Sequence, residues 1–254
     1  MWYIIYTSIK GGVSLMLHDY TKKYELLSDM FDEYDRLTPQ AILSIYEDVA
    51  ARNASLIGIG YDEVKSKKLI WAIVRVKIEI IDNPTYMGEV EVTTWPHKPN
   101  RFDFQRDFII KEKDKIILKG TSLWVLVDLE KRNLVPSSVF EELAEYDDYY
   151  VLGKGLKLNK VNKDNLIASS SFKAYGSLID HNHHMNNKKY IEKMMEVFEI
   201  DKDKKLKEFE VNFARETVKN SECDISIYQN NNEYVMEVTE NSVTKCEAYL
   251  KLDE

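Results

Sequence analysis

The feature that most restricts the fold of this 254-residue chain occurs twice: one amphipathic helix followed by about four strand-like segments. The first helix is predicted to begin after Thr38, a suitable N-cap, with Pro39 at the first helical position, and to end before Gly58 or Gly60. The second is predicted after Asn186 or Asn187, either of which can cap it. The first helix has an apolar stripe of Ala41, Ile42, Ile45, Tyr46 and Val49. The stripe of the second is Tyr190, Ile191, Met194, Met195 and Phe198.

Strand-like segments surround both helices. Their apolar and polar residues alternate with a period of two, most clearly in "RVKIEI" and "EVEVTTW". A further strand is expected just before the second helix, roughly from Ser169 to Leu178. The segments that follow the two helices are 69–82, 88–96, 101–115 and 115–129 in the first half, and 208–216, 223–229, 233–240 and 242–252 in the second.

A buried helix followed by a long antiparallel meander is typical of a sheet curled around a helix, which is the hotdog fold. We therefore predict an α+β chain of two tandem hotdog domains, each an antiparallel sheet wrapped around a central helix, and the two sheets would join into one. The pattern alone is also compatible with other α+β arrangements. The predicted boundaries are an N-terminal hotdog at 1–136, a connector at 137–160 and a C-terminal hotdog at 161–254.

Composition excludes several functions. A formal net charge of −8 argues against nucleic-acid binding, and no stretch of about 20 apolar residues predicts a membrane span. The two cysteines, Cys223 and Cys246, form no disulfide framework and indicate a reduced, cytoplasmic protein. The apolar start "MWYIIYTSIKGG" lacks the marks of a secretory signal, and we expect a first strand or an extension upstream of Met16. Whether residues 1–15 belong to the folded body stays open.

The segment 180–190, "DHNHHMNNKKY", is the densest polar motif. A metal site is not predicted, because His183 and His184 are adjacent and the second ligand set usual for zinc is missing. No cofactor is predicted either. One alternative is purely local, since Asp and Asn form helix caps and turns. The other is chemical: Asp180, Asn182 and His184 alternate and, in an extended chain, would lie on one face beside a helix N-terminus.

The motif resembles the active-site signature D-x-N-x-H-(V/M)-N-N-x-x-Y of the acyl-acyl carrier protein thioesterases. The segments "GIGYDEVKSKKLIWAIVRVKIEI", "VEVTTWP", "FQRDFII" and "TSLWVLVDLEKR" follow the order of that family. The resemblance runs from about Tyr24 to the C-terminus. The first residues lack the Arg- and Ser-rich character of a transit peptide, so we expect the bacterial branch of the family rather than the plastid one.

The resemblance implies hydrolysis of the thioester of fatty acyl-acyl carrier protein, which releases free fatty acid and holo-acyl carrier protein. It implies a catalytic set of Asp180, Asn182, His184 and Glu216, in which Asp180 is either the nucleophile or the base for water. The position of a family cysteine is held by Thr217, a poor nucleophile, which we interpret as evidence that the cysteine is dispensable. The first hotdog would accommodate the acyl chain.

Substrate-binding residues are expected at Trp71, Arg75 and Asn187, whose helix would supply N–H groups to an oxyanion. Trp95 and Trp124 are further candidates for the acyl tunnel. The predicted partner is acyl carrier protein, which is acidic, so a local basic surface is required. The candidate surface consists of Lys188, Lys189 and Lys193.

Two alternatives to this function stay open. One is an acyl-CoA thioesterase of the same fold, and the other is a non-catalytic acyl-binding hotdog protein. The sequence is also compatible with a homodimer. Acyl chain length cannot be predicted, since a one-residue error in strand register reverses which side chains face the tunnel.

Overall fold

The computed structural model describes residues 18–140, 146–157, 159 and 162–254. The expectations for residues 1–15 lie outside these ranges. The first half contains β1 (Tyr20–Glu25), α1 (Pro39–Leu56), α2 (Tyr61–Ser66), β2 (Leu69–Ile80), β3 (Glu89–Pro96), β4 (Phe104–Glu112), β5 (Lys115–Asp128) and β6 (Leu134–Val135). The second contains β7 (Leu166–Lys173), α3 (Asn187–Met195), β8 (Leu206–Phe213), β9 (Glu222–Asn230), β10 (Glu233–Glu240) and β11 (Val243–Leu252). Short 3-10 turns lie at Ser28–Met30, Ser137–Val139 and Gly176–Leu178.

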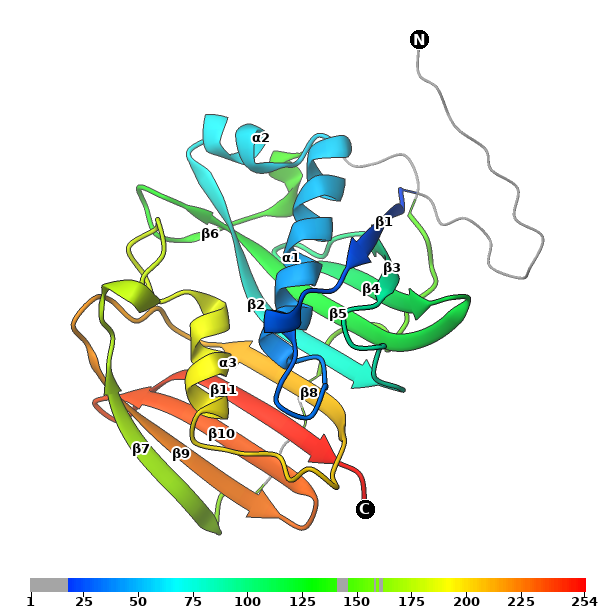
Figure 1. The fold of residues 1–254 in the computed structure, drawn as a ribbon. Coiled ribbons are helices and arrows are strands. Elements are labelled where there is room, and N and C mark those ends of the chain that lie inside the picture. The colour runs from blue at the N-terminus through cyan, green and yellow to red at the C-terminus, as the bar shows by residue number, and fades with distance from the viewer. Residues whose placement is uncertain (1–17, 141–145, 158, 160–161) are drawn as a thin grey trace.

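The strands form one antiparallel sheet in the order β1-β3-β4-β5-β2-β8-β11-β10-β9-β7, with β6 paired to β5. The two halves join where β2 pairs with β8, from Arg75 opposite Asn212 to Glu79 opposite Glu208. Figure 1 shows α1 lying across the strands of the first half and α3 across those of the second. The prediction of two helix-wrapped sheets that merge into one is confirmed.

The first helix forms as its sequence predicts. Thr38 is the N-cap and its side chain accepts a hydrogen bond from the Ala41 N–H, while Pro39 occupies the first turn. All five predicted stripe residues are buried. Gly58 follows the helix with φ +77°, a conformation that favours glycine and stops the helix. The buried residues of α1 belong to one core that also includes the inner face of both halves of the sheet and α3.

The second helix is shorter than its apolar pattern. Asn186 is its N-cap, as one of the two alternatives predicted, and accepts from the Lys188 N–H at 3.0 Å. The helix ends at Met195, so Phe198 is buried but lies beyond it. The expectation of a strand up to Leu178 is wrong. The strand ends at Lys173, whose carbonyl accepts from the Tyr175 N–H, and the chain then turns away from the sheet.

The described part of the connector crosses the outer face of the sheet. Its backbone N–H groups at Val151 and Gly155 donate to the side chains of Asp107 and Gln105, at 2.7 and 3.0 Å. Because Asp107 is fully buried, the Val151 N–H and the His97 imidazole supply partners that its carboxylate needs. Among the described residues, none of the helices combines the length and apolar character that crossing a membrane requires.

The contact between α1 and the sheet leads to a stability prediction. The Tyr46 ring stacks on Phe108 with 4.0 Å between ring centroids, and a Cβ on Gly120, which pairs with Phe108, would overlap that tyrosine. We expect Gly120→Ala to lower the free energy of unfolding by about 1–3 kcal/mol, because a well-packed core has no room for the added group. Urea unfolding followed by circular dichroism measures this. The neighbouring Lys119→Ala should change it by less than about 0.5 kcal/mol, and equal stability of both variants would contradict the close approach.

Candidate active site

The polar motif folds as a tight turn between Ile179 and Met185, which form a bridge with each other. The Asp180 N–H donates to the His184 carbonyl at 2.9 Å, and the Asp180 side chain accepts from the Asn182 N–H at 2.8 Å. Of the two interpretations of this segment, the structure shows the local turn and not the extended chain. The turn arises because the aspartate side chain bonds the backbone two residues on, which competes with extended structure.

The turn is joined to the loop that follows β8. His184 forms a bridge with Val218, and the Met185 N–H donates to the Thr217 carbonyl at 2.8 Å. These bonds bring the His184 Nε2 within 3.1 Å of the Glu216 carboxylate. The His184 side chain is 21% exposed and that of Glu216 is 54% exposed, so the pair lies at a surface opening. Asp180, Asn182, His184 and Glu216 thus lie together around one turn.

A fifth residue of this cluster was missed at the sequence level. Arg132, in the turn between β5 and β6, reaches across from the first half and forms an ion pair with Glu216. Its φ of +56° belongs to a turn whose N–H groups are held by Asp128. The Asp128 turn was readable from the sequence, but the partner of Arg132 was not, because the pair is 84 residues apart.

The three predicted carrier-binding lysines all have glutamate partners. Lys189 pairs with Glu192 and Lys193 with Glu196, each at 2.6 Å along α3. Lys188 instead reaches α1 and lies 3.2 Å from Glu47. At the start of the same helix, the N–H of Asn187, its first residue, has no hydrogen-bond partner in the described part of the chain.

Glu47 links the two halves of the molecule next to the polar turn. Burial raises the pKa of the Glu47 carboxyl, Lys188 opposes that rise, and the negative charge of Asp180 adds to it. The sequence offered a weak signal for Glu47, a charged residue beside the apolar stripe of α1. It could not identify the partner, which belongs to the other hotdog half.

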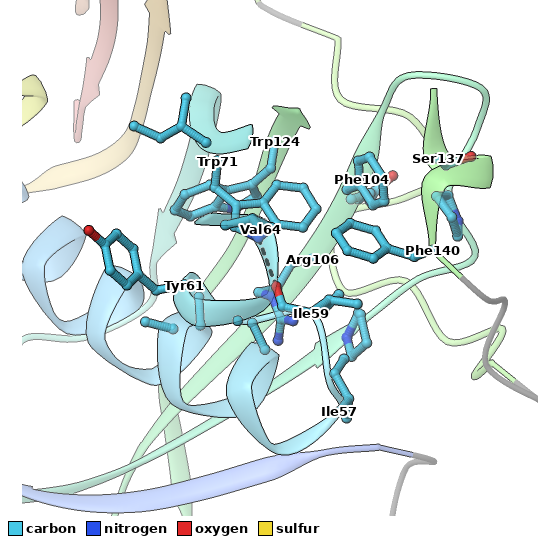
Figure 2. A pocket seen from close by; sticks show the side chains of 18 of the residues that line it. Ile57, Ile59, Tyr61, Val64, Trp71, Phe104, Arg106, Trp124, Ser137 and Phe140 are labelled. Atoms are coloured by element: carbon cyan, nitrogen blue, oxygen red, sulfur yellow. Dashed lines mark hydrogen bonds between the residues drawn. The ribbon is translucent and has the colours of Figure 1, made fainter. Parts of the chain in front are cut away.

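A cavity of about 330 Å³ lies in the first half (Figure 2). Its lining also includes His181 and Asn182 of the polar turn. Its walls are mostly apolar, and small side chains on α1 leave room for it. Those α1 residues are Ala50, Ala51 and Ala54. Figure 2 shows aromatic rings from β2, β4, β5 and the segment after β6 around the cavity, namely Trp71, Phe104, Trp124 and Phe140.

The predicted substrate-binding residues lie in different places. Trp71 lines the cavity, where its indole N–H donates to the Ile59 carbonyl at 2.8 Å and fixes the ring. Arg75 lies outside the cavity lining, at the junction of the two halves, and donates to Asn212 at 3.2 Å. Trp124 lines the cavity, whereas Trp95 is fully buried and packs against Tyr149 of the connector.

Thr217 is fully buried behind the turn. Its carbonyl holds the Met185 N–H, while the His184 Nε2 faces Glu216. The residue therefore supports the turn through its backbone.

Within the residues that the structure describes, no group of three or more His, Cys, Asp or Glu side chains could hold a metal ion.

An apolar cavity in one hotdog half borders a polar turn of the other half, and this combination is typical of a hotdog protein that binds a ligand with an apolar part and a polar part. Residues 18–146 match the family described as acyl-ACP thioesterase N-terminal domain, and residues 162–252 match the acyl-ACP thioesterase C-terminal domain. The chain therefore belongs to the acyl-ACP thioesterase family, as its motifs predicted.

Curated relatives agree with this assignment. A chloroplastic acyl-[acyl-carrier-protein] hydrolase of Cuphea viscosissima is 26% identical over 72% of this chain, and a chloroplastic palmitoyl-acyl carrier protein thioesterase of Arabidopsis thaliana is 27% identical over 67%. The matched regions make up 46% and 44% of those proteins. The chain thus spans about half the length of the curated relatives that it matches.

Solved structures support the fold. An acyl-ACP thioesterase from Bacteroides thetaiotaomicron has a TM-score of 0.84 at 24% identity, covering 93% of this chain and 98% of that one. The 12:0-ACP thioesterase from Umbellularia californica has a TM-score of 0.78 at 19% identity, covering 95% and 99%. The hotdog prediction is confirmed by this likeness.

The ion pair between the helices leads to a prediction on pH. A carboxyl whose pKa is raised by folding adds stability below its unfolded pKa, and that stability is lost as pH rises through the folded pKa. Lys188→Met removes the cation that limits the rise of the Glu47 pKa. We therefore expect this variant to lose more stability, relative to the wild type, near pH 8 than near pH 5.

Urea unfolding at the two pH values measures the difference. Lys189→Met is the matched control, because it removes a partly exposed pair within α3 and should cost less than about 0.5 kcal/mol at either pH. If Lys188→Met lost the same stability at both pH values, the proposed effect of Lys188 on the Glu47 carboxyl would be contradicted.

Proposed function

We propose that this chain hydrolyses the thioester of fatty acyl-acyl carrier protein, releasing free fatty acid and holo-acyl carrier protein. The observation that carries the proposal is the meeting of an apolar cavity with the Asp180 turn at Asn182. Family membership supports the acyl-ACP substrate class, and the hydrolase and thioesterase activities of the relatives support thioester hydrolysis. An apolar cavity suits an alkyl chain, and the polar turn suits the reacting thioester.

The proposed chemistry adds water to the thioester carbonyl and releases the thiol. Asp180 acts as nucleophile or as the base that activates water, and Asn182 and His184 orient the reacting groups. Glu216, within 3.1 Å of His184, accepts or returns a proton through the imidazole. The unpaired N–H of Asn187 stabilises the oxyanion, helped by the positive end of the α3 dipole.

Two residues from the first half would assist. Trp71 forms part of the acyl wall, and Arg132 holds the Glu216 carboxylate toward His184 by its ion pair. In this proposal the first hotdog accommodates the chain and the second performs the chemistry, within the predicted boundaries. Substrate contact by Arg75, a cytoplasmic location and a homodimer stay predictions.

The catalytic assignment is tested at Asp180. We expect Asp180→Asn to lower kcat by about 10²–10⁴-fold, because an amide can neither attack nor take a proton. Its remaining oxygen can still accept from the Asn182 N–H, so the turn and the thermal stability should be kept. The measurement is single-turnover release of fatty acid from acyl-acyl carrier protein, with matched acyl-CoA as second substrate. Turnover near that of the wild type would contradict the role of Asp180, and a preference for acyl-CoA would contradict the carrier.

We further propose that Lys188, Lys189 and Lys193 contact the acidic carrier protein. Lys189 and Lys193 have partly exposed partners on α3, which carboxylates of the carrier can replace. Both lysines lie on α3, which begins directly after the polar turn at the Asn186 cap. Lys188 contributes less freely, because Glu47 already engages it.

Charge reversal tests this surface. We expect Lys189→Glu to raise KM for acyl-acyl carrier protein several-fold and to leave KM for a small acyl thioester unchanged, because only the protein substrate meets the helix. Lys23→Glu, on β1 at the far edge of the sheet, changes the net charge equally and is the control. If Lys189→Glu affected both substrates alike, or if the control matched it, the docking surface would lie elsewhere.

A further inference from the structure

The wall of the acyl cavity contains an arginine that has no acidic partner in the described part of the chain. Arg106, on β4, lines the cavity and is only 6% exposed. Its Nη1 donates to the Asn53 side chain at 2.6 Å and to the Thr94 hydroxyl at 3.3 Å. Within the described residues, no carboxylate pairs with it, and its Nε and Nη2 groups donate to no protein atom. Figure 2 shows its side chain among the residues that surround the cavity.

A guanidinium in this position is electrostatically costly. Burial lowers the pKa of Arg106 to about 9, so the group is still charged at neutral pH. An isolated buried charge is strongly unfavourable, and proteins normally pair it. The other charged group of the same wall follows that rule, because Glu47 has Lys188. Asp107, next in sequence, cannot help, because it is held by His97 and Val151.

The free donors of Arg106 restrict what can fill the cavity. An arginine offers five N–H donors in a fixed fork, and the two neutral partners here engage only Nη1. A plain alkyl chain that reached this depth would strip water from the remaining donors and give nothing in return. A chain with an oxygen atom at that depth would satisfy them, and a carboxylate could accept two parallel bonds.

We propose that Arg106 is a specificity-determining residue that selects acyl chains carrying an oxygen acceptor, a carboxylate above a hydroxyl, at the depth of Asn53. This inference rests on the proposed function, because it takes the cavity as the acyl site. Glu47, beside the polar turn, and Asn53 are six residues apart on α1, which corresponds to about 9 Å along the helix. The oxygen therefore lies at the distal end of a chain of medium length.

Binding of free acids to the wild-type protein tests the proposal without any need for hydrolysis. The probes are a graded series of α,ω-dicarboxylic acids and the monocarboxylic acids of equal carbon number, measured by isothermal titration calorimetry. We expect a window of medium lengths in which the dicarboxylic acid binds about tenfold or more tightly than its monocarboxylic counterpart. Tighter binding of the monocarboxylic acid at every length, or no binding of any dicarboxylic acid, overturns the proposal.

Arg106→Met separates recognition from a structural role. We expect it to remove the dicarboxylic advantage and to strengthen binding of the monocarboxylic acid, because the wall becomes apolar. If Arg106 only ties α1 to β3 and β4, both acids weaken alike and the ratio is unchanged, which overturns the proposal. Arg101→Met, which removes an exposed arginine near Phe102, is the matched control and should leave the ratio as in the wild type.

Circular dichroism and a thermal melt verify that Arg106→Met is folded. If it is not, the comparison of dicarboxylic and monocarboxylic acids on the wild-type protein tests the proposal alone.

The outcomes for the two proposals are distinct. Loss of hydrolysis in the acyl-carrier assay with a retained dicarboxylic preference removes the proposed reaction but not the site. Normal hydrolysis with a monocarboxylic preference removes only the role of Arg106.

Discussion

The pairing of β2 with β8 is the interaction on which the rest of the molecule depends. Five residue pairs, from Arg75 with Asn212 to Glu79 with Glu208, join two hotdog sheets into one. The joint fixes the two helices on the same side of a continuous sheet, close enough for Glu47 of α1 to reach Lys188 of α3. Backbone hydrogen bonds at this junction therefore determine which side chains of the two halves can meet.

The site uses both halves in different ways. The first provides a cavity whose space comes from alanines on α1, and the second provides the turn with Asp180 and His184. Ion pairs also cross the junction. Arg132 of the first half pairs with Glu216 of the second, and Lys188 of the second pairs with Glu47 of the first. A single hotdog half has the cavity or the polar cluster, but not the two together, so the proposed reaction requires the joined sheet.

Charge inside the cavity distinguishes this site from a simple apolar tunnel. Glu47 is paired with Lys188, which opposes the effect of burial on the Glu47 pKa. Among the residues that the structure describes, Arg106 has only neutral partners, so the deep wall carries a positive charge that no described carboxylate offsets. Because an uncompensated charge in an apolar wall is unfavourable in the empty protein, its presence is most simply explained by a ligand that compensates it.

Local sequence determined the elements themselves. Thr38 and Pro39 start α1, Asn186 starts α3, and alternation of apolar residues marks the strands, because caps and periodic patterns act over a few residues. The motif also indicated the family. Only the tertiary structure decided that Glu216 meets both His184 and Arg132, that Lys188 meets Glu47, and that Arg106 has no carboxylate partner among the described residues. These depend on residues far apart in the chain, and no local pattern encodes which residues the sheet register brings together.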